Sequence, residues 1–164
     1  MKISEALIAE FDQEIAKTKN TLARLPNSPA YKPHAKSMSL GALAAHVVEL
    51  TGFGETVITT PALDFSSQSY KPLPFESPEQ LVKELELSAS KVRQALSGLS
   101  DSSWDEPWKL SFEGKPIFEG SRFLAYREMF LNHLVHHRAQ LGVYLRLQDI
   151  AVPGVYGPSA DEPF

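Results

Sequence analysis

Apolar residues recur every three or four positions along four segments of the chain, and each segment predicts an amphipathic helix. The predicted helices cover about residues 4–24, 39–59, 77–99 and 121–147. The stretches between and after them hold nearly all of the 12 prolines, a residue that interrupts helical hydrogen bonding. We therefore predict an all-α fold, a four-helix bundle with long irregular connections.

Two of the predicted helices begin with residues that favour a helix start. Ser39 is a suitable N-cap for the second helix, and Pro61 closes it. The third helix has the clearest start in the chain, because Ser77 is followed by Pro78 at the first helical position and by Gln80, which completes a capping-box pattern.

Two connections, residues 60–76 and 100–120, are longer than ordinary loops, and such loops are often functional coverings. The second has room for a short hairpin in which KLSF and PIF flank Glu113-Gly114. The tail after Gln148 is rich in proline and glycine and is expected to be extended. A chain of 164 residues without an internal repeat is expected to form a single domain over residues 1–164.

Composition and charge exclude several classes of protein. A chain with 43% hydrophobic and 22% charged residues is neither disordered nor collagen-like. With 16 Lys+Arg against 20 Asp+Glu and no basic block, it lacks the charge pattern of a nucleic-acid binder. Cysteine is absent, so a disulfide or a cysteine nucleophile is excluded, and any transition-metal site must use nitrogen and oxygen ligands.

The sequence shows no targeting or membrane segment. Glu5, Glu10 and Asp12 interrupt the N-terminal region before an apolar run develops, which is unlike a signal peptide. No helical segment approaches the roughly 20 apolar residues that a membrane span needs. We therefore expect a soluble, cytoplasmic protein with no membrane partner.

The five histidines are the candidates for chemistry, and three of them lie in the segment LNHLVHHRAQ. His133 and His137 are four residues apart and so share one side of a helix, among apolar neighbours that predict an orientation toward the core. His46 falls on the apolar face of the second helix. Three imidazoles in one core are costly without partners, and a shared metal ion would remove that cost. The alternative is that each ring bonds a backbone carbonyl or a tyrosine hydroxyl.

Three further residues are weaker candidates. His136 lies at the edge of the face that carries His133 and His137, and we expect it beside the ligands or at an interface. His34 is expected to be a solvated loop residue. Glu49 follows His46 by about one turn and is either a hydrogen-bond partner of a ligand or of a metal-bound water, or an ordinary solvated carboxylate.

Three nitrogen ligands leave a divalent ion with an open position, which is the pattern of catalytic metal sites. Such an ion lowers the pKa of a bound water or thiol. Nickel or zinc is favoured over magnesium, because imidazole prefers late transition metals. The chain has no phosphate-cradling Gly-rich loop and no GxSxG motif, and the lack of a carboxylate between His133 and His137 argues against a zincin protease.

The segments KSMSLGALAAHV, NHLVHHRAQLGVYLR and VPGVYGPSADE together resemble the DinB-like (YfiT-like) family of metalloenzymes. The middle helix and the loops match that family only in length and pattern. One departure is visible, since the family often has glycine after His-Arg, whereas this chain has Ala139 before Gln140.

The resemblance implies a four-helix bundle with an up-down-down-up path, often homodimeric, that holds one divalent ion, nickel or zinc, through three histidines. The matching positions are His46, His133 and His137. Related branches include bacillithiol transferases and a mycothiol-dependent maleylpyruvate isomerase, so the resemblance implies a transferase that activates a low-molecular-weight thiol and acts on a small-molecule substrate. A metal-dependent hydrolase and a non-catalytic metal-binding stress protein are the alternatives.

The fourth predicted helix is apolar on nearly every side. Leu124, Leu131 and Val135 lie opposite the histidines on a regular helical wheel. A helix of this kind needs burial on both sides, which predicts a homodimer. The alternative is a central helix that the other three helices cover.

Overall fold

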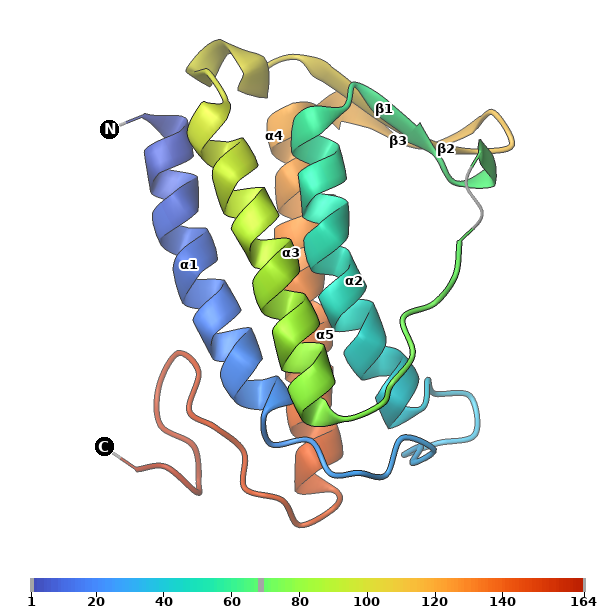
Figure 1. Cartoon of the computed structure of the whole chain (residues 1–164), viewed down its shortest axis with the longest axis vertical. Helices are drawn as coiled ribbons and strands as arrows, with labels where there is room; N and C mark the ends of the chain where they lie inside the picture. The colour runs from blue at the N-terminus through green and yellow to red at the C-terminus, as the bar shows by residue number, and fades with distance from the viewer. Residues whose placement is uncertain (1, 68–69, 164) are drawn as a thin grey trace.

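The computed structural model describes residues 2–67 and 70–163. Four helical rods form a bundle: α1 (Ile3–Leu22), α2 (Leu40–Thr59), α3 (Pro78–Gly98), and a composite rod of α4 (Arg122–Leu124), the π-helical segment η3 (Ala125–Leu131) and α5 (Asn132–Arg146). In Figure 1, α1 and the composite rod run in one direction, and α2 and α3 run in the other. The bundle therefore has the up-down-down-up path.

Serine side chains cap three of these rods, as hydrogen-bond acceptors at the N-termini. Ser39 accepts from the backbone N–H of Ala42 at 3.3 Å, and Ser77 accepts from that of Gln80 at 3.2 Å. The predicted starts of the second and third helices are confirmed. The capping box is only half made, because Oε1 of Gln80 is buried without a hydrogen-bond partner. Ser121 caps the fourth rod.

A small sheet at one end of the bundle departs from the predicted all-α fold, of which the four-helix part is confirmed. Its strands are β1 (Ala62–Asp64), β2 (Pro107–Phe112) and β3 (Lys115–Ser121), in the order β1-β2-β3. Strands β2 and β3 form an antiparallel hairpin, while β1 pairs with β2 in parallel. Figure 1 shows the sheet beyond the C-terminal end of α2. The fold is mostly helical, and both long connections contribute strands to it.

The hairpin predicted around Glu113-Gly114 is confirmed. Glu113 and Gly114 have φ values of 50° and 74°, the left-handed pair that a two-residue type I′ turn requires. Asp64 joins this turn to the first strand, because its carboxylate accepts from Ser111 Oγ at 2.7 Å and from Gly114 N–H at 3.0 Å. Hydrogen bonds from Ser66 and Ser111 hold the pKa of Asp64 well below its ordinary value.

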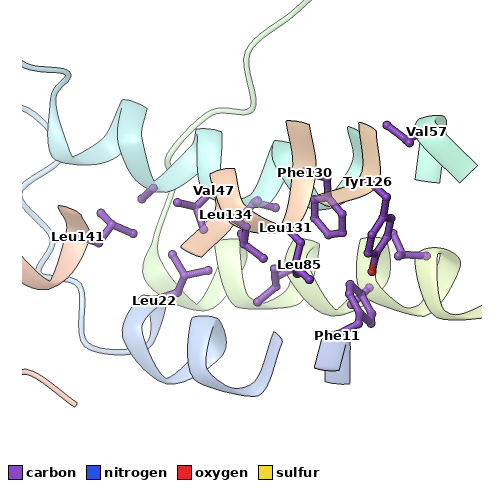
Figure 2. Packing of buried hydrophobic residues seen from close by; sticks show 14 of the residues in the cluster. Phe11, Leu22, Val47, Val57, Leu85, Tyr126, Phe130, Leu131, Leu134 and Leu141 are labelled. Atoms are coloured by element: carbon purple, nitrogen blue, oxygen red, sulfur yellow. The ribbon is translucent and has the colours of Figure 1, made fainter. Parts of the chain in front are cut away.

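All four rods contribute to one hydrophobic core. Figure 2 shows Leu22, Val47, Leu85 and Leu134, which come from the four rods in turn, directed into the space between the helices. Burial of these side chains is the main favourable contribution to folding. Among the described helices, none is long and apolar enough to cross a membrane.

The π-helical segment changes the spacing of the buried residues in the fourth rod. Buried residues within it are five apart, as in the pairs Ala125/Phe130 and Tyr126/Leu131, which matches the i→i+5 hydrogen bonds of a π-helix. Leu131 is only 1% exposed and continues the buried stripe of Leu134 and Leu141 on α5. The expectation that the histidines face the core and Leu131 faces away from it is wrong, because the half-buried histidines lie at the edge of the bundle interior. Leu124, seven residues earlier, remains 45% exposed.

Arg122 fixes the C-terminal end of α2 beneath the sheet. Its guanidinium is buried and donates to the carbonyls of Val57 at 2.7 Å, Ile58 at 3.0 Å and Thr60 at 2.7 Å. It also pairs with Glu106 at 2.9 Å. These carbonyls have no partner within the helix, so one cation satisfies them and holds the start of the sheet against the bundle.

The C-terminal segment is tied to the bundle through a buried ion pair. Arg138 and Glu14 approach to 2.7 Å, and both side chains are nearly inaccessible to solvent. The hydroxyl of Tyr156 donates to the Glu14 carboxylate at 2.7 Å. Burial alone would raise the pKa of Glu14, but the hydrogen bonds from Lys17, Tyr156 and Arg138 outweigh it and lower that pKa.

Candidate metal centre

The structure brings His46, His133 and His137 together from two helices. His46 comes from α2, and the other two lie one turn apart on α5. One ring nitrogen from each of the three lies within 4.8 Å of the others. All three side chains are half-buried, so they line the edge of the bundle interior instead of being enclosed in the core.

Hydrogen bonds to neighbouring acceptors set the orientation of two of these rings. His137 Nδ1 lies 2.7 Å from Oε1 of Gln140, an atom that can only accept, so Nδ1 carries the proton. His133 makes a hydrogen bond to the backbone of Met129, one turn before it. The remaining nitrogens, Nε2 of His133 and Nε2 of His137, face each other at 2.8 Å.

Two unprotonated Nε2 atoms at this distance direct their lone pairs at the same region, which is unfavourable without a positive centre between them. A proton or a metal ion would satisfy both nitrogens. The third imidazole, His46, favours a metal ion, because a proton shared by His133 and His137 leaves no role for a third donor. Three nitrogens and no thiolate suit a late transition metal, so the residues present fit the expected ion.

The surroundings of two of the rings lower their pKa and so favour the neutral form. Burial, and then the neighbouring imidazoles His137 and His133, lower the pKa of His46, while Glu49 acts in the opposite direction. Burial and His137 likewise lower the pKa of His133. A neutral imidazole has a free lone pair, which is the form that binds a metal.

The other candidate residues have distinct positions. Glu49 accepts hydrogen bonds from Tyr70 Oη at 2.8 Å and from the Leu73 N–H at 2.6 Å, and its Oε2 is 4.0 Å from His46 Nδ1. It is therefore neither a free solvated carboxylate nor a direct hydrogen-bond partner of His46. His34 is exposed in its loop, as predicted.

His136 lies beside the group, and Gln140 links it to a ligand candidate. Nε2 of Gln140 is 3.1 Å from Nε2 of His136, while its Oε1 holds His137. His136 thus lies beside the three-histidine group, with its ring centroid 4.9 Å from that of His137. The sequence analysis missed Gln140 as a functional residue, although its position three residues after His137 on one helix face was available as a signal.

A cavity of about 700 Å³ adjoins the histidines, and His46 and His133 form part of its wall. The rest of the wall comes from α2, the composite rod and the long connection after α2, together with Leu63 of β1 and Leu110 of β2. The sheet thus closes one side of the site. Each ligand candidate lies on a helix, and the cavity reaches His46 and His133.

Comparison with known proteins gives consistent matches along most of the chain. The model of the DinB superfamily matches residues 10–141. The "Uncharacterized protein YrdA" of Bacillus subtilis (strain 168) is 27% identical over 131 residues, which cover 78% of this chain and 72% of that protein.

Two solved structures share the fold. A DinB-like protein from Bacillus cereus (ATCC 10987) superposes with a TM-score of 0.70 at 22% identity, covering 94% of this chain and 98% of that one. The DinB-like protein YjoA from Bacillus subtilis superposes with a TM-score of 0.69 at 18% identity, covering 92% and 97%. At these identities the likeness concerns the fold alone.

Proposed function

This chain belongs to the DinB superfamily, and on that premise we propose that it is a divalent-metal-dependent enzyme whose ligands are His46, His133 and His137. The observation that carries the proposal is the pair of Nε2 atoms that face each other at 2.8 Å, with a third imidazole in the same group. Nickel or zinc is the proposed ion, since the donors are imidazole nitrogens.

The reaction that we propose is transfer of a low-molecular-weight thiol to a small-molecule substrate. A bound divalent ion supplies a Lewis acid that lowers the pKa of a thiol at its open position. Gln140 and the Met129 backbone hold two of the imidazoles in a fixed orientation, so that little reorganisation is needed when the ion binds. The absence of cysteine means that no thiolate of the protein competes for that position.

Hydrolysis is the second candidate, and Glu49 is the observation that favours it. This carboxylate lines the cavity close to His46 and is positioned by two hydrogen bonds, so it is a suitable proton acceptor for a water molecule. In the thiol reaction the same group would accept the thiol proton. A purely structural metal site is the third possibility that the experiments distinguish.

The first experiment measures metal content. Protein purified through a tag without histidine, on a column without nickel, is expected to contain about one transition-metal ion per chain by elemental analysis. The His137→Ala variant should lose it, and the His136→Ala variant should keep it, because His136 lies outside the group. Metal content that is equal in all three proteins would contradict the proposal.

The second experiment distinguishes the reactions. Cobalt-substituted protein should develop a sulfur-to-cobalt charge-transfer band when bacillithiol, mycothiol or a similar thiol is added. An unchanged spectrum across such a panel would reject the thiol transferase and leave the hydrolase. Metal that raises the melting temperature, with no thiol response and no hydrolysis of an ester panel, would indicate a structural site that joins α2 to α5.

A further inference from the structure

The cavity beside the three histidines has a strongly apolar wall. Its main lining side chains are Phe53, Leu63, Phe65, Leu110, Phe112 and Met129. These residues come from two walls of the cavity. The helical rods supply Phe53 and Met129, and the strands with the short helix η1 (Phe65–Ser67) supply the other four. Its volume of about 700 Å³ is large enough to bury most of a drug-sized molecule.

Aromatic rings form a large part of this wall. The ring centroids of Phe53 and Phe65 are 6.3 Å apart, and Phe53 also packs edge-on against Trp108 at 6.0 Å. Phe65 and Phe112 are 47% and 50% exposed, although large apolar side chains are usually buried. Both line the cavity, so a ligand that covers them would remove apolar surface from water.

The charges that line the cavity disfavour anionic ligands. Among the described residues that line it there is no lysine or arginine, and the only formal charge is the carboxylate of Glu49. That carboxylate is already paired with Tyr70 and Leu73. In the metal-free protein, an anionic group in this cavity would lose its hydration and meet the Glu49 carboxylate without a compensating lysine or arginine. A metal ion on the histidines would supply a cation at that end of the cavity only.

We propose that this cavity binds an uncharged, mainly apolar substrate that contains a planar ring, and that it disfavours anionic compounds. The ring would contact the three phenylalanines, while the histidines lie at one end of the cavity. The assignment of this molecule as substrate rests on the proposed function, but its binding does not require a metal ion.

A matched pair of fluorescent probes tests the proposal directly. N-phenyl-1-naphthylamine is uncharged, and 1-anilinonaphthalene-8-sulfonate has the same ring skeleton with a sulfonate added. In metal-free protein the uncharged probe is expected to bind at least about tenfold more tightly than the anionic one, because the sulfonate finds no cationic partner among the lining side chains. Equal affinities, or tighter binding of the anionic probe, would overturn the proposal.

Variants locate the probe. Phe112→Asp should weaken binding of the uncharged probe at least about tenfold, because it places a charge on the apolar wall. Leu87→Asp is the matched control, since Leu87 is 52% exposed on α3 and does not line the cavity. Thr56→Lys places a cation in the wall and should narrow or reverse the preference between the two probes. A second pocket lies between α5 and the C-terminal segment and is lined by Val143, Val152 and Tyr156 among others. Loss of binding in Val143→Asp, with none in Phe112→Asp, would place the probe in that pocket and refute the assignment.

The His137→Ala variant separates this inference from the metal proposal, because His137 belongs to the histidine group but does not line the cavity. Added Co²⁺ should quench the bound probe in the original protein and leave it bright in this variant. If Co²⁺ has no effect in either protein while Phe112→Asp still removes the probe, the metal proposal fails and the cavity assignment stands. If Co²⁺ binds but the uncharged probe does not, the cavity assignment fails alone.

Discussion

Replacement of Gln140 by leucine should weaken metal binding without unfolding the protein. The Gln140 amide is the acceptor for the His137 Nδ1 proton at 2.7 Å, and leucine has a similar size but no acceptor. Without that acceptor, His137 is free to rotate and to adopt the other tautomer, in which Nε2 is protonated and cannot bind a metal.

The size of the expected loss in metal affinity follows from how deeply the hydrogen bond between His137 and Gln140 is buried. Loss of a hydrogen-bonded partner behind a metal ligand typically costs 10–100-fold in affinity, or about 1.4–2.7 kcal/mol. His137 is only half-buried, so water replaces part of the lost bond, and we expect the lower end, about tenfold. Gln140→Glu keeps an acceptor and adds a negative charge, so it should bind metal at least as tightly as the original protein.

Chelator competition with Zn²⁺ or Co²⁺ measures these affinities. Gln94→Leu is the matched control, because Gln94 is exposed on α3, and its affinity should equal that of the original protein. His136→Ala removes only the far partner of Gln140 and should change the affinity less than about threefold. A Gln140→Leu affinity within about twofold of the original value, or an equal loss in Gln94→Leu, would refute the reasoning.

Three predictions concern stability and assembly. Arg122→Ala should lower the free energy of unfolding, measured in urea, by about 3–5 kcal/mol, because it leaves the last carbonyls of α2 unpaired. Arg93→Ala is the control, since it removes an exposed ion pair and should cost less than about 1 kcal/mol. Equal losses of stability in the two variants would contradict this prediction. The folded-state pKa of Glu14 is lowered, so its stabilising contribution is present above the unfolded pKa of about 4.3 and is lost as pH falls through the folded pKa. Urea titrations from pH 7 to 3 should show a weaker pH dependence in Glu14→Gln, and an unchanged dependence would argue against this role. We also propose a homodimer, because Leu124 and Val143 of the fourth rod remain 45% and 56% exposed, although Leu131 is buried. Light scattering should give twice 18.2 kDa, and the monomer mass at micromolar concentration would exclude the dimer.

The sequence alone determined the helices and the relation of two histidines. Helix starts depend on residues three positions apart, such as Ser77 and Gln80, so local composition was sufficient to place them. His133 and His137 share a face because four residues make about one helical turn. The Glu113-Gly114 turn could likewise be predicted from the sequence, since it depends on only two adjacent residues that adopt positive φ.

Only the tertiary structure decided how these elements meet. Strand β1 has three residues, and its partner β2 lies more than forty positions later in the sequence, so no local sequence pattern predicted this strand. The π-helical segment spaces buried residues five apart, as in Ala125 and Phe130, which the regular helical period does not predict. The position of His46 opposite the α5 pair, and the cavity that the sheet closes beside them, depend on contacts between distant segments. The spacing of residues in the sequence predicts which face of its own helix a side chain occupies. Which residues of other segments it contacts is decided by the fold of lowest free energy, in which packing and hydrogen bonding act over the whole chain.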